Sequence, residues 1–400
     1  MTWKVYALGL IVLVSAACHT PKSYVQESWW RVYGEARRDE GHSVQQTTDG
    51  GYIITGFIDS PSSDIGDVCL IRTDSHGDTL WIRTYGEEDE EEGGNSVRQT
   101  ADGGYIVAGY TSSCSAGNGG VYFMKTNASG DVQWTRTFGG TDYDGATCME
   151  KTSGGGYIIA GYTYSFGVGT PDYANVYLIK TDGHGDTLWT RAYGGTNEDY
   201  ANSVQPTTDG GFVVAGSTQS FGAGDGDVYL VKTDAHGDTI WTRTYGGLSS
   251  DAGYSVRQTS DGGYIIAGLT SSFGAGNNDV YLIKINAQGD TLWTRTYGGT
   301  DDDEGHSVEQ TTDGGYIVAG FTGLYGPSGG DVYLIKTNSS GDTLWTRTYG
   351  GSCEDAGNSV QQTADGGYVI AGVACSFTEG NGDVYIVKTD TIGNVDVEEP

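Results

Sequence analysis

The chain is poor in proline, in basic residues and in helical patterning. Only 6 of its 400 residues are proline, and 21 Lys or Arg stand against 52 Asp or Glu, for a formal net charge of −31. Because nucleic-acid binding depends on clusters of basic residues, this charge excludes a nucleic-acid partner. No segment after the N-terminus keeps an apolar period of 3.6 residues over three turns. We therefore do not expect helices.

Cysteine is also scarce, and the spacing of the six cysteines matches no zinc motif. Cys69 and Cys148 replace repeat residues, and we expect them to behave as small buried hydrophobic residues. Cys353 and Cys375 both fall in variable loops of the last repeat. Since an exported chain meets an oxidising compartment in many bacteria, we predict that these two form a disulfide. We expect no structural zinc and no bound cofactor.

What the chain has in abundance is a repeat. Each copy contains four short runs, as in "YSVRQT", "GYIIAGLT", "DVYLIKI" and "DTLWTRTYG", which are rich in β-branched and aromatic residues. Asp-Gly turns join these runs, and most of the 67 glycines lie in the turns and loops between runs. Aligned on the tryptophan of the fourth run, the seven copies lie 51 to 55 residues apart, at Trp30, Trp81, Trp134, Trp189, Trp241, Trp293 and Trp345.

Four-stranded units repeated at this period predict an all-β fold, a seven-bladed β-propeller of antiparallel blades, with a solenoid as the alternative. The ends of the chain favour the propeller. The seventh copy lacks its fourth run, and a matching run, "ESWWRVYG" (residues 27–34), stands alone near the N-terminus. We therefore expect an N-terminal strand to complete the last blade and close the ring.

The stretch "VYLVKTDAHGDTIWTRTYGG" (residues 228–247) resembles the tryptophan-docking repeat of bacterial PQQ-like propellers. The resemblance covers all seven copies and implies a propeller whose blades are joined through tryptophans on their fourth strands. Fourteen of the 21 basic residues also fall in two repeat columns, which predicts an architectural role. These columns are Arg31, Arg83, Arg136, Arg191, Arg243, Arg295 and Arg347, and Arg72, Lys125, Lys180, Lys232, Lys284, Lys336 and Lys388.

The N-terminus has the layout of a secretory signal, with Lys4 followed by an uncharged segment from Val5 to Ala17. Its "SAAC" ending resembles a bacterial lipobox, which implies that Cys18 is lipidated; cleavage after Ala17 without lipidation is the alternative. We predict a signal peptide at 1–17, a tether at 18–26, the propeller at 27–390 and a tail at 391–400. The expected location is the cell envelope as an outer-membrane lipoprotein, or otherwise the periplasm or the medium.

One acidic column stands out as a candidate binding site. An acid precedes the repeat serine by four residues in every copy, at Asp39, Glu92, Asp144, Asp199, Asp251, Asp303 and Asp355. On a propeller these seven carboxylates would surround one mouth. They either accept hydrogen bonds from the glycine-rich turn that follows, or form a site for Ca²⁺ or for a basic partner. Both alternatives stay open, and the metal, if any, is unknown.

No catalytic set is visible, because the histidines lie in different copies and no acid, base and nucleophile converge in one motif. Departures from the repeat cluster in the third copy, where Gly154 replaces the turn aspartate, and in the fourth, where Pro206 replaces a glutamine. We interpret the chain as a monomeric binding or scaffold propeller for protein or glycan partners. The alternatives are a propeller enzyme, as a glycan hydrolase, a lyase or a quinoprotein, or a Ca²⁺-binding surface protein.

Overall fold

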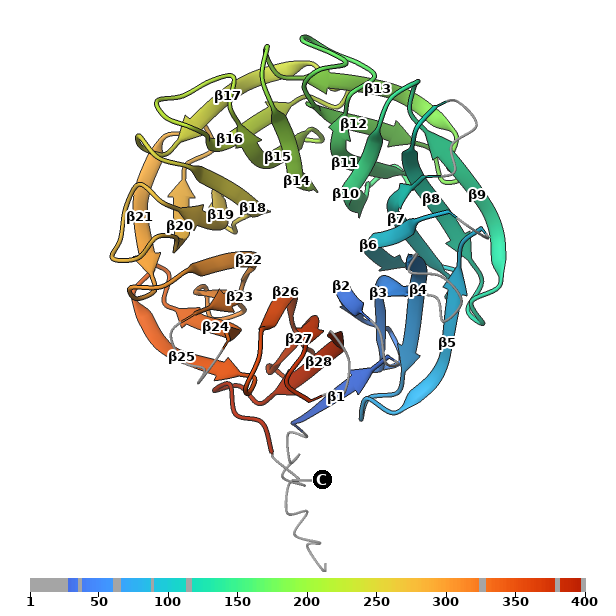
Figure 1. Ribbon diagram of the computed structural model, residues 1–400, viewed down its shortest axis with the longest axis vertical. Helices are drawn as coiled ribbons and strands as arrows, with labels where there is room; N and C mark the ends of the chain where they lie inside the picture. The colour runs from blue at the N-terminus through green and yellow to red at the C-terminus, as the bar shows by residue number, and fades with distance from the viewer. Residues whose placement is uncertain are drawn as a thin grey trace, which may run out of the picture.

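Seven four-stranded sheets form a closed ring. The computed structural model describes residues 28–34, 38–59, 66–87, 90–112, 117–323, 329–377 and 382–396. These residues contain 28 strands, grouped in antiparallel sheets around a central opening, and no helix (Figure 1). The predicted seven-bladed β-propeller is confirmed. No helix in the described part of the chain is long and apolar enough to cross a membrane.

Each blade contains four strands, ordered from the centre of the ring outward. The innermost strands are β2 (Asp39–Gln46), β6 (Glu92–Gln99), β10 (Asp144–Lys151), β14 (Asp199–Pro206), β18 (Asp251–Gln258), β22 (Asp303–Gln310) and β26 (Asp355–Gln362). The second strands are β3 (Tyr52–Asp59), β7 (Tyr105–Thr111), β11 (Tyr157–Thr163), β15 (Phe212–Thr218), β19 (Tyr264–Thr270), β23 (Tyr316–Thr322) and β27 (Tyr368–Ala374).

The third strands are β4 (Gly66–Thr73), β8 (Gly120–Thr126), β12 (Asn175–Thr181), β16 (Asp227–Thr233), β20 (Asp279–Ile285), β24 (Asp331–Thr337) and β28 (Asp383–Thr389). The outermost strands are β5 (Thr79–Tyr85), β9 (Val132–Phe138), β13 (Thr187–Tyr193), β17 (Thr239–Tyr245), β21 (Thr291–Tyr297), β25 (Thr343–Tyr349) and β1 (Trp29–Tyr33). We number the blades 1 to 7 in the order of their innermost strands, so β1 belongs to blade 7.

Blade 7 is built from both ends of the chain. Strand β1 pairs antiparallel with β28, as predicted, with Trp29 opposite Lys388 and Tyr33 opposite Val384. The alignment of Trp30 with the tryptophan column is wrong. Trp29 is the equivalent residue, because it faces Lys388 as Trp81 faces Arg72, while Trp30 stacks on Phe377. Side chains alternate across a strand, so a shift of one residue exchanges the two faces.

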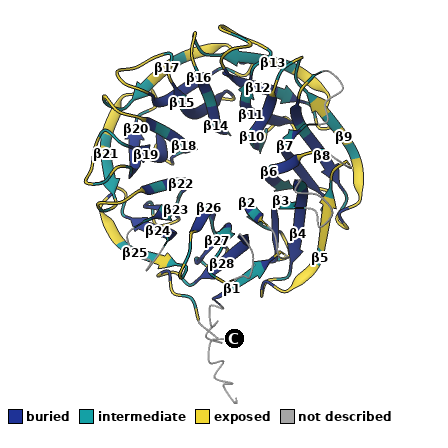
Figure 2. Ribbon diagram, in the orientation of Figure 1, coloured by how far each residue is buried: buried dark blue, intermediate teal, exposed yellow. Residues whose placement is uncertain are grey.

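Apolar side chains of neighbouring blades pack face to face. At the junction of blades 4 and 5, for example, Val228 and Leu230 pack with Val256, Tyr264 and Ile266, all of them buried. Among the strands, the outermost ones are the most exposed, except for β1, which has no exposed residue (Figure 2). Burial of both faces of the middle strands explains why these strands read as continuous apolar runs.

The outer strands also dock each blade on the next one. Trp293 of blade 5 lies over the turn at Gly341 of blade 6, and Tyr297 donates a hydrogen bond of 2.5 Å to the Gly341 carbonyl oxygen. Gly341 has φ +79°, and a Cβ there would lie 2.7 Å from the Trp293 ring, so only glycine fits. The guanidinium of Arg295 covers the same ring at 5.5 Å. The arginine column is therefore architectural.

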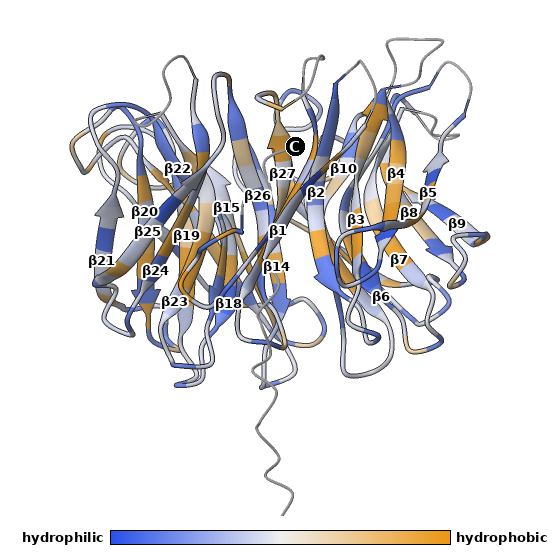
Figure 3. Ribbon diagram, turned by 90° about the horizontal axis from the view of Figure 1, so that it is seen from below, coloured by the Kyte–Doolittle hydropathy of each residue, from blue (hydrophilic) through white to orange (hydrophobic). Residues whose placement is uncertain are grey.

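The ring has two faces (Figure 3). The loop face carries the connection before each innermost strand and the connection between second and third strands. The hairpin face carries the two tight turns, as at 259–263 and 286–290 in blade 5. Residues 391–396 form part of the hairpin face. The Tyr349 hydroxyl donates a hydrogen bond to the Gly393 carbonyl oxygen, and Asp396 N–H donates one to Ser28 Oγ. The ring thus continues past residue 390.

Candidate functional site

The seven predicted acids occupy equivalent positions on the loop face, each at the first residue of an innermost strand. They are buried and do not line an open mouth, since Asp144, the most exposed of them, is only 3% exposed. Asp251 is typical. Its Oδ2 accepts hydrogen bonds from Gly247 N–H at 2.8 Å and from Ser272 Oγ at 2.7 Å.

The same two bonds recur in blades 3 and 4, where Asp144 and Asp199 bind the corresponding glycine and serine. Each acid thus joins the loop before its strand to the loop that follows the second strand of its own blade. This is the turn role that short acidic side chains commonly have. These contacts account for one carboxylate oxygen of each of these acids.

At five of the seven blade junctions, an acid of a second column faces an acid of the first. Asp227 begins β16, and Gly246 lies between Asp227 and Asp251. A Cβ on Gly246 would be 2.2 Å from Asp227 Oδ1 and 2.5 Å from Asp251 Oδ2, so both carboxylates approach this glycine. Four further junctions show the same arrangement, with the pairs Asp67 and Glu92, Asp279 and Asp303, Asp331 and Asp355, and Asp383 and Asp39. Sequence analysis missed this column, although its signal, an acid before "VYLIK", is visible in the repeat.

The paired acids carry an electrostatic cost. Burial raises the pKa of Asp331, and the charge of Asp355 adds to the effect. Burial also raises the pKa of Asp303, although bonds from Thr322 and Gly299 act in the opposite direction. Asp251 Oδ1, Asp303 Oδ1 and Asp331 Oδ1 are buried and make no hydrogen bond. Buried oxygens of this kind need a proton, a cation or water.

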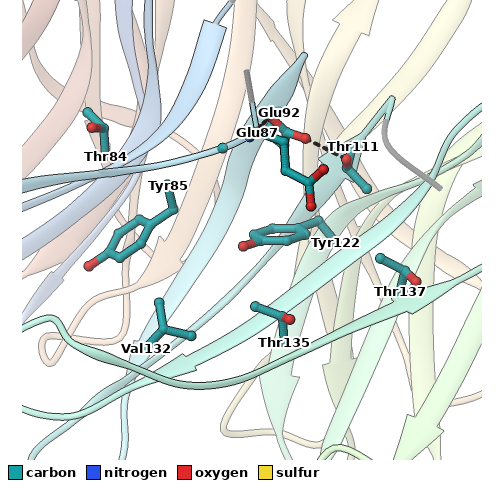
Figure 4. A pocket seen from close by; sticks show the side chains of 10 residues that line it. Thr84, Tyr85, Glu87, Glu92, Thr111, Tyr122, Val132, Thr135 and Thr137 are labelled. Atoms are coloured by element: carbon teal, nitrogen blue, oxygen red, sulfur yellow. Dashed lines mark hydrogen bonds between the residues drawn. The ribbon is translucent and has the colours of Figure 1, made fainter. Parts of the chain in front are cut away.

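No group of three or more His, Cys, Asp or Glu side chains is arranged as a metal site in the described ranges. The junction of blades 1 and 2 does contain a pocket of about 430 Å³ beside the acidic column (Figure 4). Glu87 and Glu92 lie at one end of it, and Glu92 Oε1 accepts a bond of 2.7 Å from Thr111. Tyr122, partly buried, lines the same pocket.

A cluster of tyrosines on the loop face breaks the symmetry of the ring. Tyr162 (β11), Tyr164 and Tyr200 (β14) contact one another across blades 3 and 4, with hydroxyl groups of Tyr164 and Tyr200 2.7 Å apart. Tyr164 also approaches Glu198 at 3.4 Å. In blade 5, by contrast, the residues equivalent to Tyr162 and Tyr164 are Leu269 and Ser271. We call these three tyrosines with Glu198 the tyrosine cluster.

The remaining predicted residues are placed as follows. Cys353 and Cys375 form a disulfide with Cα atoms 5.6 Å apart, Cys69 is buried and Cys148 partly buried. Cys18, the predicted lipidation site, lies outside the described residues. The five histidines that the structure describes do not converge: His42 and His306 lie on β2 and β22, and His76, His184 and His236 lie in hairpin turns of three blades.

The chain matches no known protein-family profile. It is 28% identical to the regulatory protein FlaEY of Caulobacter vibrioides over 198 residues, and this match covers 42% of the chain. The match spans only 20% of that protein's length.

Solved structures resemble the fold at low identity. The WD40 domain of Neurospora crassa Pan2 has a TM-score of 0.54 at 10% identity, covering 91% of this chain and 96% of that one. YCF48 bound to D1 peptide has a TM-score of 0.50 at 11% identity, covering 90% and 95%. Chaetomium thermophilum Sqt1 has a TM-score of 0.51 at 10% identity, covering 93% and 87%. At these identities the likeness establishes the propeller fold alone.

Proposed function

We propose that this protein is an exported, lipid-anchored propeller that binds a protein partner through its loop face, with the tyrosine cluster at the centre of the contact. Repeats build the scaffold, and function is commonly added where loops depart from the repeat. The tyrosine cluster is the departure that carries the proposal, because residues of this type are enriched in the binding surfaces of proteins.

The surrounding charge favours a basic partner. The chain carries 52 acids against 21 basic side chains, and Glu198 lies within the cluster itself. Opposite charge on the partner would speed association and select among partners. That YCF48 is bound to a D1 peptide is a precedent for a peptide ligand on a propeller of similar fold.

The test is capture of envelope proteins by the purified chain, with quantification of each retained protein. The double variant Tyr164→Ala, Tyr200→Ala should no longer capture the specific partner. The control Phe273→Ala removes an exposed aromatic ring from the loop face of blade 5 and should still capture it. Equal capture by both variants would contradict the proposal. Loss of capture after glycosidase treatment of the extract would instead assign a glycan ligand.

A second candidate, Ca²⁺ binding, rests on the acid pairs at the blade junctions. Ca²⁺ takes several oxygen ligands, and each pair offers two carboxylates. The unbonded oxygens of Asp251, Asp303 and Asp331 are the observation that favours it. A bound cation would relieve the repulsion within each pair and would stabilise the fold in proportion to its binding.

A further inference from the structure

On the hairpin face, the cation of the third strand is paired with a turn aspartate in six blades. In blade 4, Lys232 Nζ lies 2.9 Å from Asp209 Oδ2, and Lys232 is only 2% exposed. The other pairs are Arg72 with Asp49, Lys125 with Asp102, Lys284 with Asp261, Lys336 with Asp313 and Lys388 with Asp365. The aspartate also accepts bonds within its turn, in blade 4 from Thr207 Oγ1 and Gly211 N–H.

Blade 3 lacks this aspartate, because Gly154 stands in its place. Lys180 Nζ therefore donates only to neutral oxygens, Thr152 Oγ1 and the Thr181 carbonyl oxygen, each at 2.9 Å. No carboxylate forms an ion pair with Lys180 among the described residues. Burial lowers the pKa of Lys180, against the opposing charge of Asp182. The ammonium group has thus lost the partner that its counterparts have.

A second acceptor is missing at the same place. In five blades a glutamine of the next blade accepts a bond from the backbone of this turn, as Gln258 Oε1 does from Thr208 N–H at 2.9 Å. The equivalent bonds link Thr48 to Gln99, Ser260 to Gln310, Thr312 to Gln362 and Ala364 to Gln46. At blade 3 the donor is Ser153 N–H, and the next blade offers Pro206, whose side chain has no acceptor.

These two losses meet in one pocket. A cavity of about 320 Å³ between blades 3 and 4 is lined by Ser153, Gly154, Lys180 and Pro206, and also by Asp182. Asp182 already serves its own turn, since its Oδ1 accepts from His184 N–H at 2.8 Å and Asp186 N–H at 3.0 Å. A Cβ on Gly154 would meet no atom within 4 Å, so the space of the missing aspartate is open.

We propose that the pocket at Lys180 binds a carboxylate group, which takes the place of the side chain that Gly154 lacks. One carboxylate oxygen would accept from Lys180 Nζ, and the other from backbone N–H groups of the 152–156 turn. Charge-assisted bonds to both oxygens are the geometry that carboxylates favour. The carboxylate can come from a small free acid or from an acidic side chain of a polypeptide, and the two sources share this chemistry.

The test is titration of the purified protein with succinate, and separately with a capped peptide copying residues 100–104 (Thr-Ala-Asp-Gly-Gly). The peptide with Asn in place of Asp, and chloride at matched ionic strength, report binding that does not need a carboxylate. Saturable binding of succinate alone would identify a small acid as the ligand, and binding of the Asp peptide alone would identify a polypeptide. Either result supports a carboxylate site.

Two variants locate the site. Gly154→Asp supplies the missing carboxylate from within the chain, and Lys180→Gln removes the charge; each should weaken binding at least about tenfold. Lys336→Gln, which breaks the equivalent ion pair of blade 6, is the matched control and should bind as the wild type does. The proposal is overturned if no carboxylate binds more strongly than chloride, or if Gly154→Asp and Lys180→Gln bind as well as the control.

Discussion

Blades 3 and 5 share one scaffold and differ at its edges. Strands β11 and β12 pair in the register of β19 and β20. All four strands are buried except at Tyr162 and Lys180, which are partly exposed. On the hairpin face, however, blade 5 has Asp261 where blade 3 has Gly154. On the loop face, β20 begins with Asp279 where β12 begins with Asn175.

A repeat protein can change at its turns more easily than in its core. A core residue contacts two blades, so its replacement disturbs both packing surfaces. A turn residue affects the bonds of its own turn and of the third-strand cation beside it, as the absence of Asp at 154 does. Blade 3 lacks the turn aspartate and has Tyr164 where blade 5 has Ser271, without a change of strand register. These two departures are the ones on which the proposals above rest.

Every blade has four strands, and in blade 7 the fourth strand is β1. Deletion of residues 28–34 should therefore have the largest effect, because it exposes the edge of β28 and removes the Trp29 contact with the Gly77 turn. We expect aggregation and loss of a cooperative thermal transition, measured by circular dichroism and size-exclusion chromatography. A deleted protein that stays monomeric and melts as the full chain does would disprove the closure.

Blade 6 can be converted to the blade 3 pattern by Asp313→Gly. Lys336, 3% exposed, would then lack a carboxylate, and we expect the free energy of unfolding to fall by about 1–3 kcal/mol. The measurement is urea denaturation at neutral pH. The control is Asp342→Ala, which removes an exposed partner 3.5 Å from Arg295 and should cost less than about 1 kcal/mol. Equal costs would mean that the turn pairs contribute no more than surface pairs.

Calcium should act at the blade junctions that have an acid pair and not at a junction that lacks one, such as the junction at Asn175. We expect millimolar Ca²⁺ to raise the melting temperature relative to chelator, because it relieves repulsion in the five acid pairs. Asp331→Asn reproduces the residue that blade 3 already has at Asn175 and should reduce this shift, while stabilising the protein in chelator. A shift that NaCl reproduces at the same ionic strength would be ordinary screening and would exclude a specific site.

Blade 3 can also be converted to the regular pattern, by Gly154→Asp, with a small gain in stability of up to about 1 kcal/mol. Burial acts to raise the pKa of the equivalent Asp313, but bonds from Lys336 and Thr311 hold it at about 2. A depressed pKa stabilises the fold above the unfolded value of about 4, and the gain is lost as the pH falls toward 2. The stability difference between variant and wild type should follow this course in acid denaturation; a difference independent of pH would exclude the ion pair as its cause.

Several features were predictable because they repeat. The period, the four strands per unit and the orphan fourth run together predicted the ring and its closure. The face of β1 was predictable but was misassigned. Arg31 and Tyr33 follow Trp29 by two and four residues, as Arg83 and Tyr85 follow Trp81, and the pairing with β28 confirms that Trp29 is the docking residue. Likewise, the acids from Asp39 to Asp355 could be found as a column, but their burial depends on contacts with loops that are distant in sequence.

The local structure of every blade follows from short sequence patterns, because alternating apolar residues and Asp-Gly turns act over a few residues. Which side chains meet across a junction depends instead on how the blades pack in three dimensions. A Cβ on Gly246 would lie 2.2 Å from Asp227 Oδ1 and 2.5 Å from Asp251 Oδ2, so these two acids of different blades lie side by side. In the same way, Lys180, Gly154 and Pro206 come from separate runs of the chain and line one pocket. These contacts arise from the closure of the ring, which sets the distance between neighbouring blades and which no local pattern encodes.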